Sequence, residues 1–320
     1  MSRQDFVGAR RQQWQEFDKV LARLRKHSKQ RLQDSELARF PAKFRRVCQD
    51  LALARHRNYG LSIAATLNDL ALAGYHALHG VRPSPIAEIA AYLVSGFPRE
   101  VRANGASFAL CNLLFFGPFL LLFLAGFVAP EWVLAVVDIE SRTQLEASFG
   151  GDAIVRDTGS NIQMFAFYVW NNVGIDFRTF AGGIVFGLGT LFLVVSNGIT
   201  LGASFGYAAH ADLLPNFMAF TAGHGSLELM AIVIAAMSGL KLAQGLVAPG
   251  RMTRGHALRV RALEGVRLLF GAAVMTTLAA FVEGLWSASP APNEVKYVVG
   301  ACGWIAVLVF FALGGRRASV

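Results

Sequence analysis

The stretch from Phe217 to Leu246, FMAFTAGHGSLELMAIVIAAMSGLKLAQGL, decides the fold class of this protein. A lipid hydrocarbon core about 30 Å thick needs roughly 20 apolar residues in a helix, and this stretch is long and apolar enough to cross it. Four more stretches of this kind lie at about 106–129, 179–209, 264–286 and 296–314. Because no strand pattern accompanies them, we predict an all-α, polytopic membrane helical bundle.

The charge of the 320-residue chain is confined to its first third. Residues 1–103 hold 18 Lys and Arg against 9 Asp and Glu, whereas residues 104–320 hold 12 of each, so the whole net charge of +9 lies in the first part. Only 16% of all residues are charged, against about 25% in soluble domains. We therefore predict a basic cytoplasmic helical domain at 1–103 and a transmembrane bundle at 104–320. This composition excludes a soluble globular protein, a coiled coil and a disordered chain.

Cysteine content and the N-terminal sequence exclude two further classes. The three cysteines, Cys48, Cys111 and Cys302, form no CxxC pair, which argues against a disulfide framework and a zinc knuckle. The first strongly apolar stretch begins only near residue 106, so we expect no cleavable signal peptide.

Charge asymmetry between the loops predicts the orientation of the bundle, because Lys and Arg beside spans prefer the cytoplasmic side. The outer loop, residues 130–159, has six acidic residues and two arginines, whereas four arginines lie between 251 and 261 and two more at 316 and 317. The sides that these charges assign to the loops are consistent with one another if a sixth, more polar stretch at about 160–175 also crosses the membrane. We predict six crossings with both termini cytoplasmic; the alternative is a re-entrant 160–175 and five crossings.

The basic part shows the spacing of a small helical bundle. Trp14, Phe17, Leu21 and Leu24 recur at three- and four-residue intervals, as on one face of a helix, and further helical patterns follow at 35–58, 61–80 and 85–96. Positive charge beside a span is favoured by anionic lipid head groups. We therefore expect membrane lipids, and not nucleic acid, as the partner of this charge.

Glycines at four-residue spacing predict close helix packing in the bundle. They form two sets, Gly183 with Gly187, and Gly198 with Gly202 and Gly206; either set could pack within the chain or form a homodimer. The 179–209 stretch would be about 45 Å long as one helix, so it must tilt or break. We expect the break at Asn197-Gly198.

Polar residues at membrane depth require a structural or functional reason. His224 and Glu228 lie four residues apart, and Glu283 lies on the next span. Such a group could hold a metal ion, relay a proton or bind a polar substrate, or it could only hydrogen-bond the bundle together. His-x-x-x-Glu is not the HExxH zinc pattern, so we predict no catalytic residue, metal or cofactor. The predicted polar core or ligand cavity consists of Asn171, Asn172, Asn197, His224, Glu228 and Glu283.

The order of several short motifs resembles the stage II sporulation protein M family, in particular its longer members from bacteria that do not sporulate. In chain order the motifs are Phe44-Arg45-Arg46, Asp50-Leu51-Ala52, Ala54-Arg55, Phe97-Pro98 with Arg102, Asn171-Asn172, Gly182-Gly183, Gly187, Gly189-Thr190, Asn197-Gly198 with Gly202, His224-Gly225, Glu228-Leu229, and Ala279 to Gly284 followed by Ser287 and Pro290.

This resemblance implies a bacterial inner-membrane scaffold and not an enzyme. In spore-formers the family member helps to assemble a peptidoglycan-degrading complex, and the longer members often occur beside a MoxR-type ATPase. We therefore expect a scaffold for envelope or peptidoglycan remodelling, with a cytoplasmic ATPase or a cell-wall enzyme as partner. The alternatives are a transporter or channel using the polar cavity and, third, an intramembrane metal-dependent enzyme using His224 and Glu228.

Overall fold

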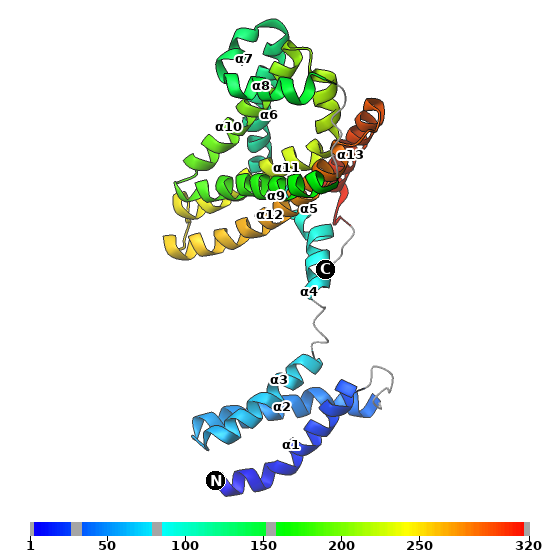
Figure 1. The fold of residues 1–320 in the computed structure, drawn as a ribbon. Helices are drawn as coiled ribbons and strands as arrows, with labels where there is room; N and C mark the ends of the chain where they lie inside the picture. The colour runs from blue at the N-terminus through cyan, green and yellow to red at the C-terminus, as the bar shows by residue number, and fades with distance from the viewer. Residues whose placement is uncertain (1–2, 27–33, 79–84, 152–157, 317–320) are drawn as a thin grey trace. The chain divides into compact units, whose positions relative to one another are not determined.

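The computed structural model describes residues 3–26, 34–78, 85–151 and 158–316, and within them the secondary structure is helical (Figure 1). The chain divides into two compact units, Met1–Glu88 and Ile89–Val320. We call them the head unit and the membrane unit. The short helix that ends at residue 103 therefore belongs to the membrane unit, although its sequence is basic like that of the head unit.

The head unit consists of α1 (Arg3–Lys26), α2 (Asp34–His56), α3 (Leu61–Leu78) and the first turn of α4 (Pro85–Ala91). These helices correspond to the four helical patterns in the sequence. Trp14, Phe17 and Leu21 are buried together, as their spacing predicts, whereas the side chain of Leu24 lies outside the described residues. The Trp14 indole donates a 2.9 Å hydrogen bond to the buried carboxylate of Asp50, so the core includes a satisfied polar pair.

Five helices of the membrane unit are long and apolar enough to cross a bilayer, which confirms the polytopic bundle. The α11 helix is central: 72% of the residues in its most apolar stretch are buried, against 28% in α6. It contacts α9, α12 and α13, while α10 lies along α6. The five helices are α6 (Gly105–Val128), α10 (Leu188–His210), α11 (Leu214–Val247), α12 (Arg254–Val282), continued by the π-helical turn η3 (Glu283–Ser287), and α13 (Asn293–Leu313).

The sixth predicted crossing corresponds to α9 (Thr158–Ala181), which is not among these five helices. With 24 residues it is about 36 Å long, and it packs against α11 and α12. Its length is sufficient for a crossing, whereas its polar residues lower its hydropathy. The six-crossing topology and the cytoplasmic termini therefore stay predictions; Arg317, one of the tail arginines used for them, lies outside the described residues.

The break in the 179–209 stretch lies at residues 182–187, so its prediction at Asn197-Gly198 was wrong. After α9 the chain forms the short 3-10 turn η2 (Gly182–Ile184), and α10 begins behind Gly187, which has a φ of +86°. That left-handed conformation suits glycine. At Asn197 the helix continues, and the side-chain amide finds its partner within the helix by donating to the carbonyl of Leu193 in the preceding turn at 2.7 Å.

The glycines of α10 pack against the backbone of α6. A Cβ atom on Gly202 would lie 2.5 Å from the carbonyl oxygen of Phe119, and Gly198 and Gly206 face the carbonyls of Phe115 and Leu122 in the same way. Gly183 instead faces Gly239 of α11. The first glycine pair therefore does not form one helical face, because Gly183 lies in η2 and Gly187 is the N-cap of α10.

The outer loop contains two helices, α7 (Pro130–Val136) and α8 (Ile139–Phe149); its residues 152–157 lie outside the described part. Asp138 caps α8 by accepting a 2.8 Å hydrogen bond from the backbone N–H of Ser141, which lowers the pKa of its carboxyl group. The amide of Asn216 donates to the carbonyls of Phe149 and Gly151 at 3.1 and 2.9 Å. The loop is thus attached to the start of α11.

A short segment before α6 contacts the C-terminal end of α13 in the membrane unit. After η1 (Tyr92–Gly96), α5 (Phe97–Ala103) brings Arg102 to the end of α13, where its two terminal nitrogens donate to the carbonyls of Phe311 and Gly314 at 2.6 Å each. These carbonyls belong to a helix end, whose last oxygens have no partner within the helix.

We expect Arg102→Ala to destabilise the membrane unit. Hydrogen bonds to a charged group contribute about 1.5–3 kcal/mol, and the variant loses two of them together with a cation at the negative end of a helix dipole. The thermal unfolding midpoint in detergent should fall. The matched control is Arg99→Ala on the same helix, since Arg99 is exposed and donates to the carbonyl of Ser95, four residues earlier in the chain. An equal fall for both variants would contradict this role.

Candidate functional site

The membrane unit contains a cavity of about 420 Å³ with a largely apolar wall that is rich in aromatic residues. The helices α6, α8, α10, α11 and α13 and the turn η3 all contribute to it. Its aromatic lining residues are Phe116, Phe119, Phe123, Phe149, Phe205, Phe217, Phe220 and Trp304. Such a wall suits an apolar group, so the polar residues in it decide what else the cavity can bind.

Three ionisable side chains line this cavity together: His224, Glu228 and Glu283. One potential ligand atom from each lies within 4.8 Å of those from the other two. His224 and Glu283 are only 4% and 8% exposed. We call these three residues the polar cluster. Two of the three are acidic, so the cluster is suited to bind a cation or a hydrogen-bond donor.

Two different local structures build the polar cluster. The four-residue spacing of His224 and Glu228 places both on one face of α11, with 3.8 Å between His224 Nε2 and Glu228 Oε2. Glu283 is the first residue of the π-helical turn η3 at the end of α12. Single π-turns within α-helices are rare and often occur at functional sites.

Ser287 and Lys296 support the cluster, although only Ser287 was noted in the sequence, and then only within a motif. The Oγ of Ser287 lies 3.1 Å from His224 Nδ1. The ammonium group of Lys296 donates to the carbonyls of Ser287 and Ser289 at 2.9 and 3.0 Å. This lysine therefore fixes the turn that carries Ser287. A lysine at the start of an apolar span was the available sequence signal.

The three asparagines of the predicted polar core lie elsewhere. Asn171 donates to the side chain of Asn172 at 2.8 Å, and Asn197 bonds within its own helix. They are not among the residues that line the cavity. Of the six predicted residues, the structure thus gathers three at the cavity.

Asp176 of α9 is a buried acid that the sequence analysis did not single out. Its side chain is 0% exposed and accepts a 2.6 Å hydrogen bond from the hydroxyl of Thr276 on α12. The signal that could have identified it is an acid within an otherwise apolar helix.

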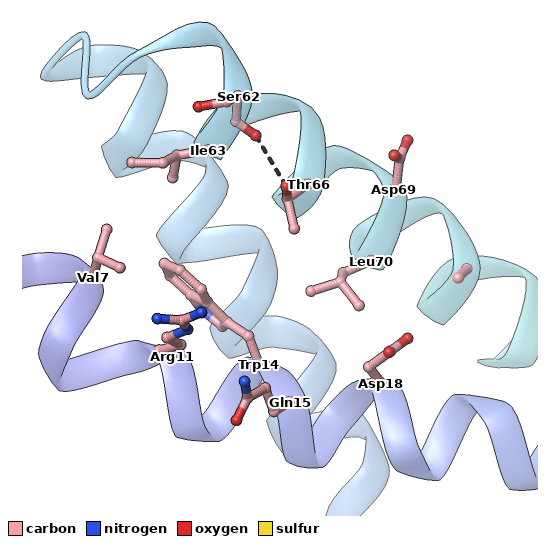
Figure 2. A pocket seen from close by; sticks show the side chains of 11 residues that line it. Val7, Arg11, Trp14, Gln15, Asp18, Ser62, Ile63, Thr66, Asp69 and Leu70 are labelled. Atoms are coloured by element: carbon pink, nitrogen blue, oxygen red, sulfur yellow. Dashed lines mark hydrogen bonds between the residues drawn. The ribbon is translucent and has the colours of Figure 1, made fainter.

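A second cavity, of about 560 Å³, lies on the head unit between α1 and α3 (Figure 2). We call it the head groove. Figure 2 shows the Trp14 ring between the two helices, with the carboxylates of Asp18 and Asp69 projecting from α1 and α3. Thr66 is exposed on the α3 side, and its hydroxyl donates to the carbonyl of Ser62 at 2.9 Å. The groove thus combines an apolar floor with a charged rim.

Each of the two units matches a known protein family or domain model. Residues 4–80 match a domain of unknown function (DUF8413), and residues 119–288, just over half of the chain, match stage II sporulation protein M. No curated protein and no solved structure matches the chain. The second match includes α9 to α12, the glycine faces and the whole polar cluster. The protein, a helical membrane protein with several apolar spans, therefore belongs to the stage II sporulation protein M family.

Proposed function

We propose that this protein is an assembly protein of the bacterial inner membrane that recruits partners for envelope or peptidoglycan remodelling and performs no chemistry of its own. The observation that carries the proposal is the head groove. It lies on a unit with its own hydrophobic core and its own family match, attached by the chain to a membrane bundle. In the predicted topology the groove is cytoplasmic, while α7 and α8 offer a second surface outside.

The lining of the head groove favours an amphipathic helix as the bound segment. Ile63 and Leu70 offer an apolar floor beside Trp14, and the charged lining residues are two carboxylates, Asp18 and Asp69, and one cation, Arg11. A helix binds such a groove with its apolar face, and basic residues beside that face would pair with the two carboxylates. The partner that the family resemblance suggests for this groove is a cytoplasmic ATPase; a cell-wall enzyme, the alternative partner, would instead meet the outer surface formed by α7 and α8.

The test is in-cell crosslinking of the tagged full-length protein, followed by mass spectrometry. We expect recovery of a cytoplasmic ATPase, and at least tenfold less of it with Thr66→Arg, because the long charged side chain would fill the groove. The control is Ala65→Arg, which adds the same charge at the neighbouring exposed position outside the groove. Recovery of the protein alone, or equal recovery with both variants, would refute the proposal.

A second candidate function, a transporter or channel, is favoured by the membrane cavity with its polar cluster. The variant Glu228→Gln separates the two functions. An assembly protein should keep its fold and its partner capture, whereas a transporter should lose solute flux in proteoliposomes with its fold intact. A variant that cannot fold would instead show that Glu228 acts as part of the structural hydrogen bonding.

A further inference from the structure

We propose that His224, Glu228 and Glu283 bind one divalent transition-metal ion, with Zn²⁺ the ion that suits them best, and that its remaining coordination position opens into the aromatic cavity. This site does not depend on the docking role of the head groove. It rests on the distances within the polar cluster, on the group that orients His224, on the local charge and on the adjoining space.

The distances fit metal ligation better than a direct hydrogen bond. The 3.8 Å between His224 Nε2 and Glu228 Oε2 exceeds the 2.7–3.2 Å of an N–H···O hydrogen bond. In a tetrahedral zinc site, bonds of about 2.0–2.1 Å separate the ligand atoms by roughly 3.4 Å. Since all three ligand atoms lie within 4.8 Å of one another, small rotations of the two flexible glutamates bring them to one ion.

The orientation of His224 supplies the second argument. A histidine that binds a metal through one ring nitrogen commonly donates the other N–H to a neighbouring group, which fixes the ring and its tautomer. Ser287 Oγ is placed to accept from Nδ1 at 3.1 Å, and this tautomer leaves the Nε2 lone pair directed at the carboxylates. Lys296 fixes the position of Ser287 by donating a hydrogen bond to the carbonyl oxygen of Ser287.

The negative charge of the polar cluster supplies the third argument. Two carboxylates in close proximity repel each other when both are ionised, and burial strengthens the repulsion. The buried amine of Lys296 donates to the carbonyls of Ser287 and Ser289. The buried amine of Lys241 pairs with Glu264. A divalent ion would neutralise Glu228 and Glu283 together, while neutral His224 adds no charge.

Ligand chemistry and space determine the class of ion. One imidazole and two carboxylates form a nitrogen–oxygen set that suits zinc and related transition ions. Zinc sites with three protein ligands keep a fourth position for water or another ligand. The 420 Å³ cavity that the three side chains line provides room for it. The spacing His-x-x-x-Glu places two ligands on one helical face, as the two histidines of HExxH do, while Glu283 comes from the next helix.

The experiment measures Zn²⁺ binding to the full-length protein in detergent after chelator treatment. We expect one Zn²⁺ per chain by equilibrium dialysis and elemental analysis. Glu228→Gln and Glu283→Gln should each weaken binding by more than roughly 100-fold, and Ser287→Ala by roughly 10- to 100-fold, as for groups that orient a ligand. The matched control is Glu294→Gln, which removes an exposed carboxylate of the same unit and should leave binding unchanged.

X-ray absorption at the zinc edge decides the case without any variant. The expected first shell consists of nitrogen and oxygen at about 2.0–2.1 Å, with the outer-shell signature of one imidazole. A sulfur shell, no stoichiometric zinc in the wild-type protein, or equal binding in Glu228→Gln and the Glu294→Gln control would overturn the proposal. Folding of each variant is checked by its far-ultraviolet circular dichroism and elution volume; where one fails to fold, the absorption spectrum of the wild-type protein gives the answer.

Discussion

Replacing Gly202 with leucine is expected to prevent accumulation of the folded protein in the membrane. A Cβ atom at this position would lie 2.5 Å from the carbonyl oxygen of Phe119 and 2.6 Å from its Cα. Both atoms belong to the α6 backbone, so no side-chain rotation relieves the clash, and the two helices must separate. Overpacking in a well-packed core costs typically 1–3 kcal/mol; displacement of a backbone along the α6–α10 contact should exceed this range.

The measurement is the amount of monodisperse protein extracted from membranes, together with its thermal unfolding midpoint. Thr200→Leu is the matched control, because it adds leucine to the same helix at an exposed position, where lipid accepts an apolar side chain. Gly202→Ala should give an intermediate result, since the Cβ alone already meets the backbone. Normal abundance and an unchanged midpoint for Gly202→Leu would show that α10 and α6 do not pack through this face.

The variant Thr276→Val is expected to destabilise the membrane unit through Asp176. The hydroxyl of Thr276 donates the 2.6 Å bond that the buried Asp176 carboxylate accepts, and the other oxygen, Oδ1, has no hydrogen-bond partner among the described residues. Valine keeps the shape but removes the donor. An acceptor left unsatisfied in the interior costs about 1–3 kcal/mol, and more when it is charged, so the thermal midpoint in detergent should fall clearly.

A double variant tests the reason for this loss. Adding Asp176→Leu to Thr276→Val removes the unsatisfied acceptor, and replacing both partners by apolar groups can be nearly neutral. The double variant should therefore be more stable than Thr276→Val alone. Thr277→Val is the control, since its exposed hydroxyl bonds to the carbonyl of Ala273 in its own helix. If the double variant is less stable than Thr276→Val, the loss does not come from the buried acid.

The fold class followed from the sequence because insertion into lipid depends mainly on the composition of each stretch. The stretch Phe217–Leu246 therefore predicted a span that the structure contains as α11. The head helices were predictable for a similar reason, because the spacing of Trp14, Phe17 and Leu21 requires only the local helical period. The spacing of the glycines in α10 also predicted a packing face, although it did not identify α6 as the partner helix.

Other features depend on contacts between distant residues and on backbone geometry, which periodicity does not encode. The break before α10 lies at Gly187 because that residue adopts a left-handed φ, whereas Asn197 looked polar enough for a break but bonds within its helix. The pairing of Asp176 with Thr276 spans 100 residues. The meeting of Glu283 with His224 requires α11 and α12 to pack and η3 to place the carboxylate. Local composition thus accounts for which segments are helical and apolar, and tertiary packing accounts for which polar groups share one cavity.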